Sequence, residues 1–488
     1  MTSETFLWYD FETFGADPRR DRPAQFAALR TDAELNIIGE PEVFYCRPAD
    51  DVLPQPAACL ITGITPQTAA GRGLPENEFA ARIFELMSVP GTCVVGYNNF
   101  RFDDEVTRHL LWRNFFDPYS REYANGNSRF DLIDLLRMTR ALRPKGIEWP
   151  DYDDGRPSFR LEDIAAANGM DTTNAHDALA DVEATIAVAG LVRSHNPKLW
   201  QWALGLRRKH VVAELLHKGR PLVHTSSRYP AQPGCNTAAV LPLCPHPQIG
   251  SQWLVWNLDV DPTPFLDFDE EMLADLYWTP SADLPEDLER VPVKLVRTNR
   301  CPMISPLGVL DTESSQRLEI DHARLKAHTR LIERQPDFVA RLAAIFASPR
   351  EFPDNDPELD LYGGFPPPGD QRMFPRIRNM SAEELADLDT PFTDERLNEL
   401  LFRYRARLWP DSLDADEQAR WADYRRRRLI DDPELGSIRW AEYRELLEKM
   451  GAEFPHHAEL LADLAAWPER IGLQQLAETI NQSLGAHS

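Results

Sequence analysis

The chain has 488 residues, of which 43% are hydrophobic and 27% charged, and a formal net charge of −25. This balance is typical of a globular protein, and the length predicts several domains of roughly 100 to 200 residues each. No apolar run reaches the roughly 18 residues that a bilayer-spanning helix needs, so we expect a cytoplasmic protein with no membrane segment. The six cysteines contain no C-x-x-C pair, which argues against a zinc site and a disulfide framework.

The acidic net charge by itself argues against a nucleic-acid partner, since such proteins need basic residues that neutralise phosphates. Net charge does not, however, fix the local field inside a cleft. Basic residues are in fact bunched in the segments 137–145, 207–210, 294–300, 403–407 and 425–428. Any anionic ligand would have to be bound at such local concentrations of charge.

Short β-rich runs alternate with helical patterns through the first 198 residues, which predicts an α/β domain with a mixed sheet. Strands are expected at 6–11, 37–46 and 93–97. Helical periodicity covers 76–87, 103–115, 131–142, 160–168 and 176–193.

The pattern changes after this first region. Residues 199–350 hold short β-rich segments between 221 and 302, typical of a small barrel or open sheet, followed by a helical stretch at 321–347. A Pro-, Gly- and Asp-rich loop at 348–370 follows, and the region 351–488 is otherwise helical, with patterns at 381–387, 394–407, 415–429 and 438–450. We therefore predict three domains at 1–198, 199–350 and 351–488.

The first candidate site feature is Asp10-Phe11-Glu12 at the end of the first expected strand. Side chains alternate along a strand, so the two carboxylates point to the same face. Mg²⁺ takes oxygen ligands, and this pair is suited to half of a metal site. Alone, the pattern is more often a solvated strand edge.

A second feature is Gly96 to Asp104, where an apolar strand runs into an Asn-Asn turn and then a helix. Asp103 is either a helix cap, the commoner role of an Asp at this place, or a third carboxylate at the sheet edge. The third feature is His176 with Asp181 five residues later at the start of a helical pattern. This pair is usually an ordinary surface pair, yet His is the side chain best suited to accept a proton near neutral pH.

Together these residues supply what two-metal phosphodiester hydrolysis needs: several carboxylate ligands and a base for the attacking water. D-x-E, N-N-x-x-F-D and H-x-x-x-x-D, in this order, resemble the three motifs of the DEDDh exonuclease superfamily. The segments GYNNFRFDDEVTRHLLWRNFFDPY, NSRFDLIDLLR, NAHDALADVEATIA and LLFRYRARLWP further resemble the bacterial exodeoxyribonuclease I family, over nearly the whole chain.

This resemblance implies an RNase H-like exonuclease domain, an SH3-like β-domain and an all-α C-terminal domain. It also implies processive 3′→5′ degradation of single-stranded DNA with a free 3′ end to 5′-mononucleotides, in DNA repair and recombination. By position, Asp10, Glu12, Asp103 and Asp181 would hold two Mg²⁺ ions, with Mn²⁺ able to substitute, and His176 would be the general base. Asp104 is the poorer ligand candidate, because the motif's Asp directly follows Phe102.

The resemblance also places residues on the substrate and on a partner protein. Glu12 and Arg160 are expected to contact the substrate near the metals, and further DNA contacts are expected from Arg108, Tyr119, Tyr123, Arg137, Trp202, Lys209 and Lys294. The acidic tail of single-stranded DNA-binding protein is expected to dock near Arg143 and Trp202. We expect the chain to be a monomer.

Two alternatives remain open from the residues alone. One is a different DEDDh nuclease, such as a proofreading subunit or an oligoribonuclease, although these are far shorter, and the carboxylates do not exclude an RNA substrate. The other is a nucleic-acid-binding or scaffolding protein that keeps the fold without the chemistry. The completeness of the five-residue set favours an enzyme.

Overall fold

The computed structural model describes residues 4–173, 177–232, 234–286, 288–347, 355–388 and 391–477. The chain divides into two compact units. The first combines residues 1–127, 173–183 and 352–488, and the second combines 128–172 and 184–351. The first unit is therefore assembled from segments that lie far apart in the sequence.

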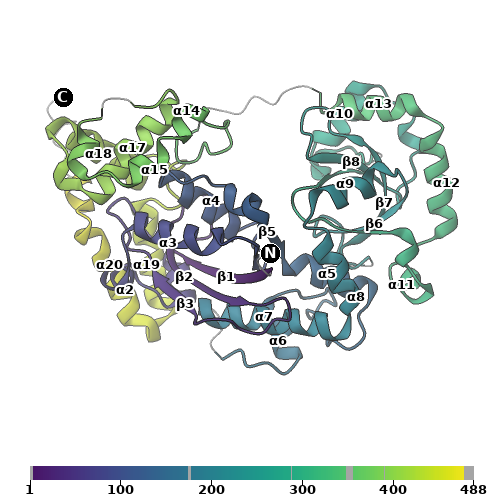
Figure 1. The fold of residues 1–488 in the computed structure, drawn as a ribbon, viewed down its shortest axis with the longest axis horizontal. Coiled ribbons are helices and arrows are strands. Elements are labelled where there is room, and N and C mark those ends of the chain that lie inside the picture. Colours follow the sequence, from purple (N-terminus) through teal and green to yellow (C-terminus); the bar gives the residue numbers. More distant parts are fainter. Residues whose placement is uncertain are drawn as a thin grey trace. The chain divides into compact units, whose positions relative to one another are not determined.

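A mixed sheet forms the centre of the first unit (Figure 1). Those of its strands that belong to the first unit lie in the order β3-β2-β1-β4, with β1 antiparallel to β2 and parallel to β4. The elements here are β1 (Thr5–Thr13), β2 (Pro23–Thr31), β3 (Glu42–Tyr45), α1 (Pro56–Thr62), α2 (Pro66–Arg72), α3 (Glu76–Ser88), β4 (Thr92–Gly96), α4 (Asp103–Arg113) and the start of α7 (Ala178–His195).

Alternation along β1 places its two carboxylates on the face opposite one of its apolar cores. Leu7, Tyr9 and Phe11 are buried in one core with residues of α3 and α4. Asp10 and Glu12, one position out of step, therefore emerge on the opposite face. The sheet thus offers its carboxylates at the end of a strand whose other face is firmly packed.

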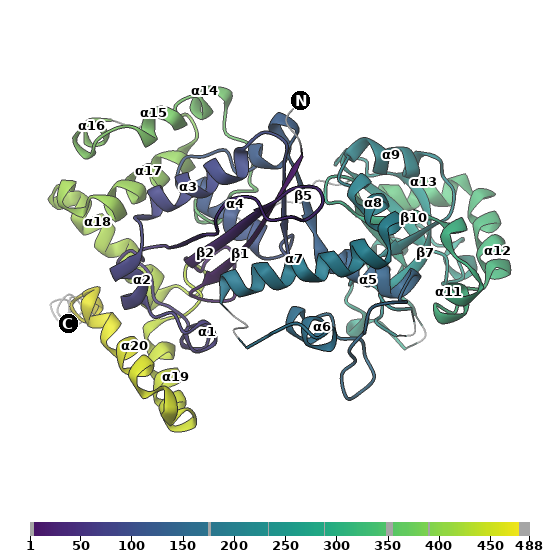
Figure 2. The ribbon, with the colours of Figure 1, turned by 60° about the horizontal axis from the view of Figure 1, so that its bottom comes forward.

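Helices of the C-terminal region complete the first unit. They are α14 (Pro368–Gln371), α15 (Phe374–Arg378), α16 (Ala382–Ala386), α17 (Glu395–Leu408), α18 (Ala415–Arg426), α19 (Trp440–Glu453) and α20 (Ala458–Arg470). Helices α19 and α20 lie side by side (Figure 2) and share an apolar core with Phe14, Val52 and Cys59. A second core joins Trp112 and Phe115 to α15 and α17.

A buried group of charges also joins the C-terminal helices to the N-terminal segment. Glu358 Oε2 lies 2.5 Å from Arg22 Nη2, and Asp51 Oδ2 lies 2.8 Å from Arg407 Nη2. Arg428, in a π-helical turn after α18, donates hydrogen bonds to the carbonyl oxygens of Asp51, Arg20 and Leu435. These charges are almost fully enclosed and therefore depend on one another for compensation.

The second unit contains an antiparallel sheet in the order β10-β6-β7-β8-β9. Its strands are β6 (Leu222–Thr225), β7 (Thr237–Pro245), β8 (Gln252–Asn257), β9 (Val293–Arg297) and β10 (Met303–Pro306). The unit also holds β5 (Ser128–Asp131), α5 (Leu132–Leu142), α6 (Leu161–Ala167), the rest of α7, α8 (Pro197–Gly205), α9 (Lys209–His217), α10 (Glu270–Trp278), α11 (Thr312–Arg317), α12 (His322–Glu333) and α13 (Pro336–Ala344).

The predicted elements agree with this fold in type and differ at particular places. Strand β2 was not predicted, and the helical stretch expected at 321–347 is broken between α12 and α13, where Pro336 starts the second helix. The loop expected at 348–370 is irregular over much of its described part, but it is not simply exposed, because Glu358 and Leu361 are buried. The domain boundaries at 198 and 350 remain predictions.

All six cysteines are free, four of them buried. Within the described residues, no helix combines the length and the apolar character needed to cross a bilayer.

The buried charges predict a large difference between two glutamates of the C-terminal region. Glu358→Ala leaves Arg22 and Arg407 buried without this partner, so we expect the free energy of unfolding to fall by about 3–5 kcal/mol. Glu434 pairs with Arg20 at the surface, where its side chain is 81% exposed, so Glu434→Ala should change little. Urea unfolding measures both variants, and equal losses would contradict a stabilising role of the buried group.

Candidate active site

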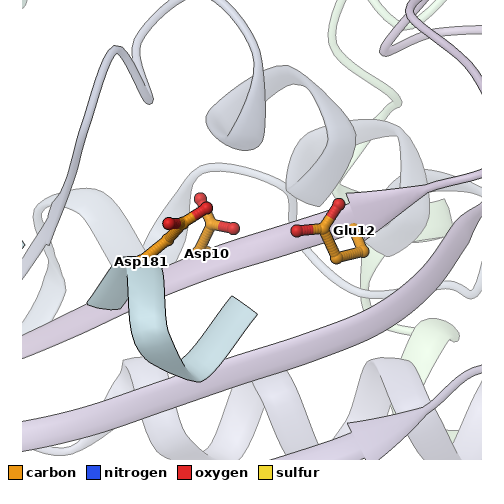
Figure 3. A group of neighbouring side chains, drawn as sticks. All are labelled: Asp10, Glu12 and Asp181. Carbon is orange, nitrogen blue, oxygen red and sulfur yellow. The ribbon is translucent and has the colours of Figure 1, made fainter. Parts of the chain in front are cut away.

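Three carboxylates from two segments of the chain meet at the end of β1. Asp10 and Glu12 rise from the same side of the strand, and Asp181 reaches Asp10 from the first turn of α7 (Figure 3). One oxygen from each of the three lies within 4.8 Å of the others. Two of the three sequence motifs are thereby brought into one group.

Asp103 joins the same strand end through the backbone. Strand β4 pairs with β1 only as far as Trp8, so the edge of β1 beyond that point has no strand beside it. Asp103 Oδ1 accepts a hydrogen bond of 3.2 Å from the Phe11 amide at this edge. The N-cap of α4 is Phe102 and forms no side-chain cap, so the carboxylate of Asp103 is committed to β1 and the helix-cap alternative is not supported.

The turn that delivers Asp103 is tightly packed. A Cβ on Gly96 would lie 2.8 Å from the Asn99 side chain and 3.2 Å from the Tyr9 carbonyl oxygen, so only glycine fits there. Asn98 has a φ of 61°, a conformation that Asn tolerates better than most residues. The Gly-Tyr-Asn-Asn sequence therefore fixes the path from β4 to α4.

Burial and mutual repulsion raise the pKa values of these carboxyls. Burial, with the charges of Asp103, Glu12 and Asp181, holds the pKa of Asp10 well above its usual range. The pKa of Glu12 rises to about 8 by burial and the charge of Asp181, then Asp103 and Asp177. Burial raises the pKa of Asp103 to about 7. Such a cluster of oxygen donors is unfavourable as a set of bare anions, and it fits a divalent cation.

Two further residues of the motifs are His176 and Asp104, and the structure describes only the second. His176 lies outside the described residues. Asp104 is fully buried and accepts hydrogen bonds from Tyr9 Oη and Arg121 Nη2, so it faces away from the strand end. This supports the choice of Asp103 over Asp104 as the ligand candidate.

The substrate candidates of the first unit fall into two kinds. Tyr123 is 68% exposed and Tyr119 is half-buried, so both present ring surface to solvent. Arg108 is 5% exposed, and its guanidinium pairs with Glu105 and Glu122. Its role as a DNA contact remains a prediction.

Two aromatic residues near Tyr119 were not predicted from the sequence. Phe365 is 81% exposed, and its ring meets that of Tyr119 edge-on at 5.7 Å. Tyr362 donates a hydrogen bond of 2.6 Å to Glu105 Oε2. The available signal was the pair of aromatic residues in the sequence YGGFPPPGD, a segment whose Pro and Gly content otherwise indicates only a loop.

Three candidates of the second unit are cations of different exposure. Arg160 is exposed and pairs with Glu162, and Lys209 is exposed at the first turn of α9. Lys294 is half-buried on β9, and burial together with the charges of Arg290 and Arg228 lowers its pKa.

The remaining candidates of the second unit have partners inside that unit. Arg137 lies 2.6 Å from Asp134 and over the ring of Phe159. Arg143 Nη2 donates to the carbonyl oxygen of Val309, and Trp202 Nε1 donates to that of Ile304.

Comparison with known proteins matches three family models in succession. They are an exonuclease model over residues 7–189, an exonuclease I SH3-like domain over 207–348 and an exonuclease I C-terminal domain over 355–471. The exodeoxyribonuclease I of Escherichia coli K12 is 44% identical over 470 residues, covering 96% of this chain and 98% of that protein.

Solved structures match at similar coverage. The exonuclease I of Methylocaldum szegediense superposes with a TM-score of 0.91 at 49% identity, covering 96% of this chain and 99% of that one. The zinc-bound complex of E. coli exonuclease I with single-stranded DNA gives a TM-score of 0.88 at 42% identity, covering 97% and 100%. The order of domains expected from the sequence is confirmed by these matches.

The raised carboxyl pKa values predict an unusual pH dependence for the metal-free protein. Between about pH 4 and 8 the folded state holds more protons on these carboxyls than the unfolded state, so stability falls as pH rises through this window. Asp10→Asn removes one repelling charge. We expect it to raise the Tm at pH 8 in EDTA, with about 1.4 kcal/mol for each pKa unit relieved, and to have less effect at pH 5.

Thermal unfolding across this pH range measures the effect. Asp153→Asn, at an exposed site in the second unit, is the matched control and should leave the Tm unchanged. A Tm of Asp10→Asn at or below that of the unmodified protein at pH 8 would show that repulsion among the carboxyls is not a significant cost.

Proposed function

Because the chain belongs to the exodeoxyribonuclease I family, we propose that it degrades single-stranded DNA processively from the 3′ end to 5′-mononucleotides in DNA repair and recombination. It is a hydrolytic nuclease, and the family depends on metal ions. The observation that carries the proposal is the meeting of Asp10, Glu12 and Asp181 within 4.8 Å, with Asp103 bound to the same strand.

The carboxylates have the donor chemistry for two Mg²⁺ ions, with Mn²⁺ as a substitute. Asp10, Glu12, Asp103 and Asp181 would hold the ions, because hard cations take carboxylate oxygens and these four repel one another otherwise. When bound, two such ions polarise the phosphoryl group and lower the pKa of the attacking water. His176 takes the proton of that water, which suits a side chain that titrates near neutral pH.

The elements that carry the carboxylates also hold them in position. Strand β1 and helices α4 and α7 are regular elements, so their side chains are held with little conformational freedom. Holding the reacting groups in place removes much of the entropic barrier to hydrolysis. Glu12 also contacts the terminal nucleotide in this proposal, since its carboxylate lies beside those of Asp10 and Asp181.

Aromatic and basic side chains would hold the DNA strand. Tyr119, Tyr123 and Phe365 expose ring surface, and base stacking on such rings is worth about 1–3 kcal/mol for each base without regard to sequence. Arg160, Arg137, Lys209, Lys294 and Trp202 are the proposed contacts of the second unit. This local binding is compatible with a net charge of −25, because phosphates respond to the field close by.

Membership of the same family also motivates a proposal about a partner protein. We propose that the acidic tail of single-stranded DNA-binding protein binds at Arg143 and Trp202, where a half-exposed guanidinium and an indole lie in the second unit. The chain would act as a monomer in the cytoplasm.

Removal of single carboxylates tests the mechanism. Asp10→Asn and Asp181→Asn each delete a ligand charge, and we expect both to abolish Mg²⁺-dependent nucleotide release from a single-stranded oligonucleotide. His176→Ala should lower the rate by about 10² to 10⁴-fold, the usual contribution of a general base. Release is measured by quantifying mononucleotides, with circular dichroism to check folding.

The same assay with different oligonucleotides tests the direction of degradation separately from the preference for single-stranded DNA. A blocked 3′ end should stop release, while a blocked 5′ end or a free duplex competitor should not. An RNA oligonucleotide of the same sequence tests the sugar preference. Full activity in EDTA or in Asp10→Asn would overturn the mechanism, and release from a 3′-blocked strand would overturn the polarity.

Binding of a tail peptide tests the partner site. Arg143→Ala and Trp202→Ala should each weaken binding of an acidic, Phe-ended peptide by roughly tenfold or more, as expected of a charge and an aromatic anchor. Arg156→Ala is the matched control, because this arginine is exposed in the same unit and forms an ion pair with Asp154, two residues earlier in the chain. Fluorescence anisotropy measures the Kd, and unchanged values in both variants would remove these residues from the site.

A further inference from the structure

A buried ion pair lies directly behind the metal-ligand candidate Asp103. Arg121 Nη2 is 2.7 Å from Asp104 Oδ1, and both side chains are completely shielded from solvent. Tyr9 Oη donates a hydrogen bond of 3.1 Å to the same carboxylate oxygen. None of these three residues belongs to the group of carboxylates at the end of β1.

The ion pair sits where it can set the position of Asp103. Asp103 and Asp104 are neighbours in the first turn of α4, and both are bound to β1. Asp103 accepts from the Phe11 amide, and Asp104 accepts from the Tyr9 side chain two residues earlier. The start of α4 is therefore attached to the catalytic strand at two points, and Arg121 compensates the charge of the Asp104 carboxylate at one of them.

The network continues away from the site through alternating charges. Arg121 Nη2 lies 3.8 Å from Glu122 Oε1, which is 2.8 Å from Arg108 Nε. Arg108 Nη1 lies 2.9 Å from Glu105 Oε1, and Tyr362 Oη, from the C-terminal region, donates to Glu105 Oε2. Arg108 is thus an inner member of this network.

We propose that Arg121 is a positioning residue for Asp103, acting through its buried ion pair with Asp104. Without Arg121, the buried Asp104 carboxylate loses its cation, and we expect the start of α4 to shift so that this carboxylate reaches solvent or other donors. Movement displaces Asp103 from Phe11. The inference rests on the proposed metal-dependent function, because Asp103 matters as a ligand.

A double-mutant cycle of Arg121→Gln and Asp104→Asn, which removes charges without reversing them, tests the role of Arg121. We expect Arg121→Gln to raise the Mg²⁺ concentration that gives half-maximal nucleotide release by about tenfold, and to weaken Mg²⁺ binding measured by calorimetry without DNA. Arg121→Gln combined with Asp104→Asn should recover most of this loss, because an amide pair needs no compensating charge. Arg113→Gln is the matched control, since Arg113 is equally buried on α4 but pairs with Glu76. It should lower the Tm and leave the Mg²⁺ dependence unchanged.

The possible outcomes test the role of Arg121 separately from the proposed nuclease function. A folded Arg121→Gln with Mg²⁺ half-saturation within twofold of the unmodified protein overturns it, as does an equal shift in Arg113→Gln. If Arg121→Gln does not fold, Asp104→Asn alone decides: a raised half-saturation supports the inference and an unchanged one overturns it. An unmodified protein without Mg²⁺-dependent release would instead refute the proposed function.

Discussion

Repulsion among carboxylates is the constraint on which the rest of the first unit depends. Asp10, Glu12 and Asp181 converge within 4.8 Å in a partly buried place, with Asp103 nearby, and each charge raises the pKa of others. Such an arrangement persists only when surrounding structure is rigid enough to hold it. The apolar face of β1, the tight Gly96 turn and the double attachment of α4 supply that rigidity.

The C-terminal region contributes to this rigidity more than its position in the sequence suggests. Two apolar cores and the buried charges around Glu358 fix it to the N-terminal segment. Tyr362 extends the contact to the network behind α4. The region after residue 355 is therefore part of the framework of the catalytic unit, and its loop before α14 also carries the exposed aromatic rings of Tyr362 and Phe365.

The local geometry of the candidate site follows from residues that are neighbours in the sequence. Strand alternation places Asp10 beside Glu12, and the Asn-Asn turn starts α4 at Asp103, so neighbours along the chain determine both features. Strand β2 could not be predicted in the same way: PAQFAALRT is buried at nearly every position, and it has neither clear alternation nor strand-favouring composition, since three alanines favour helix. Its strand form comes from pairing with β1.

Contacts between residues that are distant in the sequence could not be predicted either. The partnership of Arg121 with Asp104, and of Tyr362 with Glu105, joins residues that no periodicity relates. Arg108 illustrates the same limit, because its ion pairs with Glu105 and Glu122 could not be read from the sequence, while its role as a DNA contact stays a prediction. Residue type predicted chemistry, and tertiary packing decided which groups are available for it.

The discontinuous first unit has a consequence for synthesis of the protein. Residues 1–127 leave the ribosome before more than 200 intervening residues, which takes roughly 10 to 50 s at about 5 to 20 residues per second. During that interval Phe14, Val52 and Trp112 lack the helices that will cover them. The nascent chain is therefore exposed to chaperones, and its nuclease centre gains its full framework only after the C-terminal helices have been translated.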